Sequence, residues 1–256
     1  MAADAPKEIV PRVIHYCWMS GDPFPAKIRE CVDSWRRVMP DYELKLWTKD
    51  NFDVDSVPFV REAVEVRKWA FAADYIRMYA LYTEGGIYLD SDVRVLKRFD
   101  DFLGHSFFSS LEHHPTLMDE RGSWDLIDKE GRRTADEYIA GMQIQAAVMG
   151  AAPGYPFVRD VLDFYSDRHF INVDGSYATD PIAPLIYARV AEPYGFRYVD
   201  RDQKLKDDMM IYRSEIFAGN RREMTADSYA VHLCAHSWHA TPAEKLRAFC
   251  RRLLKK

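Results

Sequence analysis

The sequence has few cysteines, and none of them has the spacing of a cysteine-based site. Its four cysteines are Cys17, Cys31, Cys234 and Cys250. The absence of a Cys-x-x-Cys pair argues against the common zinc and thioredoxin-like arrangements, and the N-terminus does not resemble a secretory signal. We therefore expect reduced thiols in a cytoplasmic protein.

The chain also lacks a long apolar run and an excess of basic residues. No stretch approaches the roughly 18 apolar residues that a membrane-spanning helix needs. The formal net charge of -5 gives no basic field for general nucleic-acid binding, so we expect no nucleic-acid partner. An anionic substrate would therefore need local cations or a metal ion.

What the sequence does contain is material for a large core. Hydrophobic residues make up 48% of its 256 residues and aromatic residues 14%, a content suited to stacking against flat or sugar-like ligands. This length favours one domain over residues 1–256, in which residues 112–138, with little periodicity, form an inserted loop or small lobe.

The order of the first elements predicts a parallel sheet. A β-rich run ends at Trp18, a helical pattern runs from Pro25 to Pro40, and residues 42–47 alternate with period two. Strand, helix and strand in this order form a βαβ unit, so the fold class is α/β. Further helices are expected at 58–67, 69–83, 156–168 and 180–190, and further strands at 93–96, 107–110, 143–150 and 229–233.

The most informative stretch is residues 84–93, in which a glycine pair precedes a short apolar strand that ends in Asp90-Ser91-Asp92. If this stretch stays extended, both carboxylates lie on one side of the backbone, where a divalent cation would relieve their repulsion. The alternative is a solvated turn. Because open α/β sheets keep their sites at the carboxyl ends of strands, the position favours a functional role.

Three other places have both a functional and a structural interpretation. Asp74 and Arg77 lie on one face of an apolar helix and either pair with each other or face a cleft beside Asp90. Trp18, at the end of the first strand, is either a core residue with a capped indole or a stacking platform for a base. Close to the C-terminus, one of three histidines, such as His232, is expected to complete a mostly carboxylate metal site.

The last segment, residues 241–256, begins with a helix-start pattern at Thr241 and continues as a basic amphipathic helix. This helix either docks on its own domain or touches anionic lipid, which would give a peripheral contact with the inner face of the membrane.

Together these motifs resemble the DXD sugar transferases of glycosyltransferase family 32, which include bacterial capsular polysaccharide transferases and Och1-like mannosyltransferases. The glucosylating bacterial toxins look like distant relatives. The resemblance covers residues 9 to about 112 and returns at 229–238; its motifs are Pro11–Trp18, Ser34-Trp35, Pro40–Tyr42, Ala73–Arg77 with Tyr82, and Gly85–Asp92.

This resemblance implies a GT-A fold with a mainly parallel central sheet, a nucleotide-sugar donor, with a UDP-sugar expected, and Mn²⁺ or Mg²⁺. It implies hexosyl transfer with retention to a saccharide or lipid-linked saccharide acceptor, as in bacterial surface or capsular polysaccharide synthesis. The resemblance assigns Asp90, Asp92 and Arg77 to catalysis. It assigns donor binding to Trp18, Asp74, Arg77, Asp90, Ser237 and Trp238, and metal binding to Asp92, Asp90 and His232.

The sequence departs from the family at Leu233, Cys234 and His236, which leaves open which histidine reaches the metal. Two other functions stay open. The strand followed by D-x-D-x-V also resembles the haloacid dehalogenase signature, in which Asp90 would be a phosphorylated nucleophile and Asp92 a general acid. A non-catalytic sugar-binding protein is the second alternative.

Overall fold

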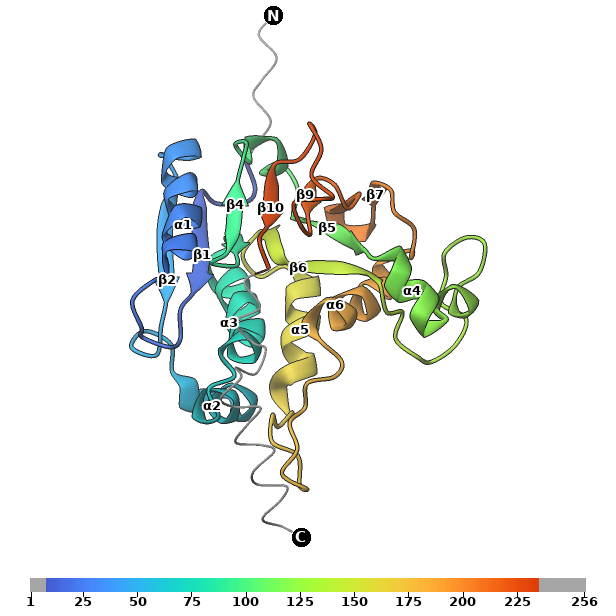
Figure 1. Cartoon of the computed structure of the whole chain (residues 1–256), viewed down its shortest axis with the longest axis horizontal. Helices are drawn as coiled ribbons and strands as arrows, with labels where there is room; N and C mark the ends of the chain where they lie inside the picture. The colour runs from blue at the N-terminus through green and yellow to red at the C-terminus, as the bar shows by residue number, and fades with distance from the viewer. Residues whose placement is uncertain (1–7, 235–256) are drawn as a thin grey trace, which may run out of the picture.

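The computed structural model describes residues 8–234, which form a mixed α/β fold around a seven-stranded sheet (Figure 1). The strands of this sheet, in spatial order, are β2 (Glu43–Trp47), β1 (Val13–Cys17), β3 (Gly86–Leu89), β6 (Met142–Ala151), β5 (Phe107–His113), β8 (Met209–Tyr212) and β7 (Gln203–Lys204). The predicted α/β class, with a central sheet flanked by helices, is confirmed.

Five of the seven strands run in one direction, and β6 and β7 run against them. The pairs β1·β2, β1·β3 and β5·β8 are parallel, whereas β3·β6, β5·β6 and β7·β8 are antiparallel. The first half of the sheet is thus the parallel unit that the strand, helix and strand order predicts, because a parallel pair needs a crossover connection such as α1 (Ala26–Val38).

Helices cover both faces of the sheet and bury two groups of apolar residues. The helices are α1 (Ala26–Val38), α2 (Pro58–Glu65), α3 (Trp69–Glu84), α4 (Pro115–Arg121), α5 (Pro156–Ser166) and α6 (Ala183–Ala191). The larger group lies under α2, α3, α5 and α6, and the smaller one lies between the sheet and α1. Helix α3 is apolar on most sides because it is packed between neighbours.

A second sheet of three short strands covers the smaller core. It consists of β4 (Val93–Val95), β10 (Ala230–His232) and β9 (Phe217–Ala218), with β10 in the middle. β4 follows directly after the acidic motif, and β10 comes from the end of the described chain. This sheet therefore joins two segments that are far apart in the sequence (Figure 1).

The glycine pair ends α3 and starts β3, as expected. Gly85 and Gly86 have φ angles of 66° and 103°, which disfavour residues with a side chain. A Cβ atom on Gly85 would lie 2.6 Å from Pro153, and one on Gly86 would lie 2.7 Å from the carbonyl oxygen of Val13. The reversal between helix and strand therefore depends on glycine at both positions, and it sets Asp74 and Arg77 beside the end of β3.

The segment between β5 and β6 contains α4 and a loop closed by a bridge between Ile127 and Arg133. Figure 1 shows this segment projecting from one end of the sheet, where the sequence predicts an inserted loop or lobe. Within residues 8–234, no helix is both long and apolar enough to cross a membrane. Ser237, Trp238 and the expected helix at 241–256 lie outside the described residues.

Candidate metal and donor site

The acidic motif lies on a tight turn between two sheets. The extended arrangement of Asp90–Asp92 that was considered from the sequence is therefore not formed. β3 ends at Leu89 and β4 begins at Val93, and the backbone N–H of Val93 donates to the carbonyl oxygen of Asp90 at 2.9 Å. The chain must turn here because β3 pairs in the large sheet and β4 in the small one. The turn, not strand alternation, brings the two carboxylates together.

Asp90, Asp92 and His232 form a cluster that could hold a metal ion. One ligand atom from each lies within 4.8 Å of the others, and Nε2 of His232 is 3.1 Å from Oδ1 of Asp92. Carboxylate oxygens with one imidazole nitrogen suit Mn²⁺ and, less well, Mg²⁺. Burial by itself would lower the pKa of His232, but its hydrogen bonds to Asp92 and Cys234, together with the negative charges of Asp92 and Asp90, outweigh this and raise that pKa well above the usual value.

His232 reaches the motif through backbone pairing. β10 runs antiparallel to β4, which sets His232 opposite Val93, and the N–H of Leu233 donates to the carbonyl oxygen of Asp92 at 3.0 Å. Sequence reasoning named His232 but had no signal for this pairing, since about 140 residues separate the two strands. Among the histidines in residues 8–234, the one that lies beside both carboxylates is His232.

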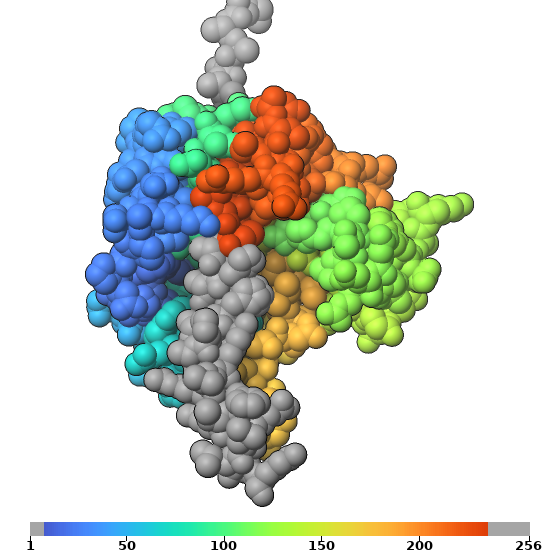
Figure 2. All heavy atoms as spheres, viewed as in Figure 1, coloured from blue at the N-terminus to red at the C-terminus, as the bar shows by residue number. Residues whose placement is uncertain are grey.

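Helix α1 holds both strands in place. The indole N–H of Trp35 donates to the carbonyl oxygen of Val93 at 2.8 Å, and the ammonium group of Lys27 donates to that of Leu233 at 2.9 Å. In Figure 2 the blue N-terminal region adjoins the red segment near the end of the described chain. Lys27 thus brings a positive charge close to the acidic cluster, a role that the sequence analysis missed.

Arg77 lies beneath the cluster as part of a buried ionic group. Its side chain is 4% exposed, and its Nη2 lies 3.1 Å from Asp74 and 3.3 Å from Asp90. Its Nη1 donates to the carbonyl oxygen of Ala146 at 2.7 Å, and its guanidinium group stands 4.8 Å from the ring centre of Tyr88. The pairing of Asp74 with Arg77 that the sequence left open is present, and it extends to Asp90.

Asp74 is in an unusual electrostatic position. Burial raises the pKa of its carboxyl to about 7, although Arg77 acts in the opposite direction, and the negative charge of Asp90 adds to the increase. One guanidinium group shared by two carboxylates compensates only part of their repulsion. A carboxyl group poised near neutral pH at the edge of a site is a candidate ligand-binding group.

Trp18 lines a pocket of about 570 Å³ at the ends of β1 and β2. Its indole N–H donates to the carbonyl oxygen of Asp22 at 2.6 Å, and its ring meets that of Phe24 edge-on, with the centroids 4.9 Å apart. Trp18 is therefore capped, as one interpretation expected, yet it remains partly exposed in the pocket. The other residues lining this Trp18 pocket are Met19, Gly21, Asp22, Pro23, Phe24, Leu46, Thr48, Lys49 and Asp50.

The Trp18 pocket and the acidic cluster lie at the same edge of the sheet. β1 and β3 are parallel neighbours, with His15 opposite Tyr88. Continuing this register sets Cys17 level with Asp90, so Trp18 follows one residue beyond that level. A ligand with a flat ring at one end and a charged group at the other can therefore lie along this edge.

A phosphatase of the haloacid dehalogenase type would need a second acidic motif beside Asp90, but the acidic pair Asp207 and Asp208 lies at the opposite edge. They immediately precede β8, whose Met209 pairs with Phe107. β8 runs in the same direction as β3, so its start is remote from the end of β3 where Asp90 lies. The carboxylates that a phosphatase would combine are not brought together by this fold.

Tyr88 is a site residue that the sequence analysis did not single out. Its hydroxyl donates to Oδ1 of Asp90 at 3.0 Å. The signal was available, because residues two apart on a strand face the same side and Tyr88 precedes Asp90 by two.

A comparison with family models finds a match to the part of the chain that contains the acidic motif. The model described as "Glycosyltransferase sugar-binding region containing DXD motif" matches residues 25–109. The chain is 29% identical to inositol phosphoceramide mannosyltransferase 3 of Schizosaccharomyces pombe over 185 residues, which are 68% of this chain and 43% of the yeast protein. The match thus spans less than half the length of that relative.

A second relative is the uncharacterized glycosyltransferase L373 of Acanthamoeba polyphaga mimivirus, 23% identical over 240 residues, 90% of this chain and 84% of the viral protein. Among solved structures, the chain is similar to the PaToxG glycosyltransferase, with a TM-score of 0.47, 14% identity and coverage of 73% of this chain and 71% of the other. It is also similar to the galactosyltransferase LgtC, with a TM-score of 0.45, 12% identity and 91% coverage of both chains. The resemblance seen in the sequence is supported over residues 25–109, which match the model of the sugar-binding region that contains the DXD motif.

Proposed function

We propose that this chain transfers a hexosyl group from a nucleotide-sugar donor, with UDP as the expected nucleotide, to a saccharide acceptor. The observation that carries the proposal is the convergence of Asp90, Asp92 and His232 within 4.8 Å at the sheet edge that also holds the Trp18 pocket. Both the base and the diphosphate of a donor then have a place on one edge.

The cation would be Mn²⁺ or Mg²⁺, held by Asp92 and Asp90 with His232. Once bound, it would stabilise the negative charge on the departing diphosphate. His232 must lose its proton to act as a ligand, and Asp92, at 3.1 Å, keeps the ring oriented until then. The chemistry of the three donor groups fits this role.

The remaining described groups would bind and orient the donor. Trp18 would stack on the base at the mouth of its pocket, and Asp74, ionised above its pKa of about 7, would accept hydrogen bonds from sugar hydroxyls. Arg77 would act from beneath by holding Asp74 and Asp90. Ser237 and Trp238, outside the described residues, complete the donor set that the resemblance implies.

Retention of anomeric configuration through a front-face reaction would need no protein nucleophile, so we assign none. Asp90 and Asp92 bind metal and donor in this scheme, and they do not form the separated carboxylate pair of a glycoside hydrolase. A role in bacterial surface or capsular polysaccharide synthesis and a cytoplasmic location complete the proposal.

The test is slow donor hydrolysis without acceptor, measured on a panel of UDP- and GDP-sugars with Mn²⁺. Because of the names of the yeast relatives, the donors include one that carries mannose, and inositol phosphoceramide is tested as an acceptor in a second assay. Release of nucleoside diphosphate from one donor would identify nucleotide and sugar together. Phosphate release from simple phosphomonoesters would favour a phosphatase, and donor binding without turnover on any panel acceptor would favour a sugar-binding protein.

Asp92→Ala should lose metal-dependent UDP binding while the fold survives, as measured by calorimetry and circular dichroism. Asp163→Ala removes an exposed carboxylate on α5 and is the matched control. Unchanged UDP affinity of Asp92→Ala in Mn²⁺ would remove Asp92 from its role.

Membrane contact through residues 241–256 is tested on the full chain by flotation with anionic liposomes. Binding that weakens with salt supports a lipid-facing helix. No salt-sensitive binding would leave a docked helix as the answer.

A further inference from the structure

Tyr88 is the buried polar residue closest in sequence to the acidic motif, and the donor scheme above leaves it without a role. We propose that Tyr88 is a positioning residue whose hydroxyl fixes the carboxylate of Asp90 so that the second oxygen faces Asp92 and His232. This inference rests on the proposed function in one respect, the divalent cation at these three side chains.

Two hydrogen-bond donors, one from Tyr88 and one from Arg77, contact the same oxygen of Asp90. The Tyr88 hydroxyl lies 3.0 Å from Oδ1, and Nη2 of Arg77 lies 3.3 Å from the same atom. Hydrogen bonds from two directions to one oxygen set the plane of the carboxylate and direct Oδ2 away from them. We infer that Oδ2 is then the oxygen that Asp90 offers to the cluster.

Tyr88 also supports the second of these donors. The guanidinium group of Arg77 stands 4.8 Å from the centre of the Tyr88 ring, a distance typical of a cation–π contact. A single side chain thus holds Arg77 with its ring and Asp90 with its hydroxyl. Replacing Tyr88 with Phe keeps the contact of the ring with Arg77 and removes the hydroxyl, and with it the hydrogen bonds to Asp90 and to the thiol of Cys17.

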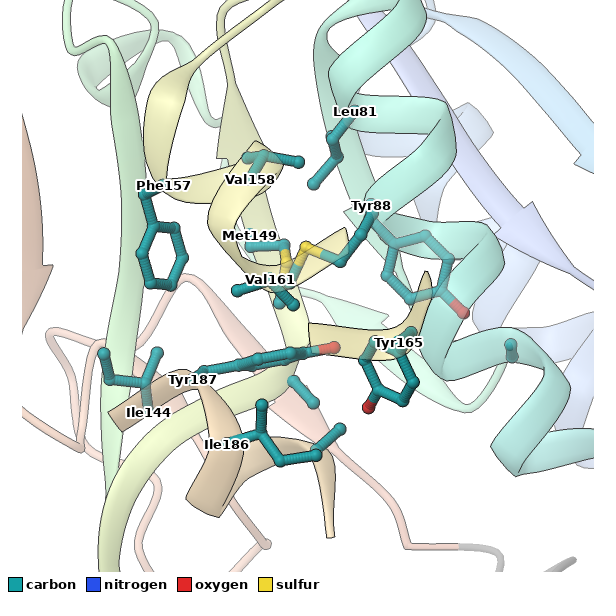
Figure 3. Packing of buried hydrophobic residues seen from close by; sticks show 14 of the residues in the cluster. Leu81, Tyr88, Ile144, Met149, Phe157, Val158, Val161, Tyr165, Ile186 and Tyr187 are labelled. Carbon is teal, nitrogen blue, oxygen red and sulfur yellow. The ribbon is translucent and has the colours of Figure 1, made fainter. Parts of the chain in front are cut away.

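The position of the hydroxyl is itself fixed by the sheet and the core. Tyr88 pairs with His15 on one side and Met149 on the other, and its side chain is 1% exposed. Figure 3 shows its ring among Met149, Tyr165 and Tyr187 in the buried cluster on the α3 side. Asp90, by contrast, lies beyond the last residue of β3 and is 25% exposed. The rigidly held hydroxyl of Tyr88 therefore restrains the carboxylate of Asp90, whose rotation the backbone of Asp90 does not restrict.

Loss of the hydrogen bond between Tyr88 and Asp90 would change the affinity for the cation in opposite directions through electrostatics and through geometry. A carboxylate that loses a donor becomes more basic and would attract a cation more strongly. A carboxylate that loses its orientation must be ordered again when the cation binds, and outer hydrogen bonds of this kind are typically worth about 10-fold to 100-fold in metal affinity. If Tyr88 is a positioning residue, the second effect is the larger one.

The experiment is a titration of the full chain with Mn²⁺ alone, followed by calorimetry. Tyr88→Phe is expected to bind Mn²⁺ at least about 10-fold more weakly than the unmodified chain. Tyr155→Phe is the matched control, because the buried hydroxyl of Tyr155 donates to the carbonyl oxygen of Asp207 at the opposite sheet edge. It should bind Mn²⁺ as the unmodified chain does.

A second variant separates positioning from general damage. In the Asp90→Asn background, Tyr88→Phe should cause no further loss, because the oriented carboxylate is already gone. Equal or tighter Mn²⁺ binding by Tyr88→Phe alone would overturn the inference. It would also be overturned if Tyr88→Phe weakened Mn²⁺ binding in the Asp90→Asn background as much as it does in the unmodified chain. Absence of Mn²⁺ binding by the unmodified chain would overturn it together with the metal site.

The outcomes keep this inference apart from sugar transfer. Weaker Mn²⁺ binding by Tyr88→Phe, with no donor on the panel hydrolysed, would support positioning while the proposed transfer fails. Donor hydrolysis with equal Mn²⁺ affinities would do the reverse.

Discussion

Replacing Arg77 with methionine tests the ionic group beneath the site. Methionine keeps much of the length of the side chain and removes its charge. Asp74 and Asp90, 3.1 and 3.3 Å from Nη2, would lose the cation that they share, and the carbonyl oxygen of Ala146 would lose a donor at 2.7 Å. Two neighbouring carboxylates would then remain without compensation.

Breaking a buried ion pair from one side costs about 3–5 kcal/mol. Because Asp90 is 25% exposed, we expect the lower end, about 3 kcal/mol in the free energy of unfolding. For a chain of this size, this corresponds to a fall of about 6–12 °C in Tm. Some of the loss should be recovered at low pH, where one carboxylate takes up a proton.

The assay is thermal and denaturant unfolding followed by circular dichroism. Arg159→Met is the control, because Arg159 is exposed and contacts the hydroxyl of Tyr82, so its loss should leave the free energy of unfolding almost unchanged. An Arg77→Met variant within 1 kcal/mol of the unmodified chain would refute the reasoning about stability. A loss of donor affinity without loss of stability would assign Arg77 to donor binding alone.

Three further predictions concern single groups of the site. Burial raises the pKa of Asp74 to about 7, so the folded state holds its proton more tightly than the unfolded chain; this contribution to stability is therefore present at low pH and is lost as the pH rises towards 7 and above. Denaturant unfolding between pH 5 and 8 should show this decline, and a decline just as steep in Asp74→Asn would assign it to other groups. Mn²⁺ affinity should rise with pH, because the pKa of His232 is raised well above its usual value by the hydrogen bond to Asp92 and the protonated ring cannot bind metal. Calorimetry of His232→Gln should give a weaker affinity with a shallower pH profile, and an identical profile would exclude His232 as the titrating ligand. Trp18→Ala should lose most of the fluorescence quenching that free UDP causes, and equal quenching in both proteins would end the stacking assignment.

The sequence located the acidic motif and the elements around it because local signals agree there. Gly85 and Gly86 mark the reversal between α3 and β3, and the apolar run after them can only be a short strand. The spacing of Asp74 and Arg77 placed both on one helical face, where the structure has them. Pro25 and Pro40 bracketed α1 to within two residues.

The arrangement of the two aspartates was beyond local reasoning. Strand alternation would have put them on one side of an extended chain, but the turn at 90–93 sends Asp90 towards Arg77 and Asp92 towards His232. That turn exists because β4 leaves the large sheet to pair with β10. Pairing between segments so distant in the sequence has no short-range signature.

By itself, the sequence determined the class of fold, the region that matches the DXD sugar-binding model and the residue types of the candidate site, because helix ends, strand alternation and the DXD motif each depend on a few neighbouring residues. Only the tertiary structure decided which groups meet. It set His232 against Asp92 through a three-stranded sheet, gave Arg77 to both Asp74 and Asp90, and placed the hydroxyl of Tyr88 on Asp90. These contacts depend on strand order and helix packing, which bring together residues that no local pattern connects.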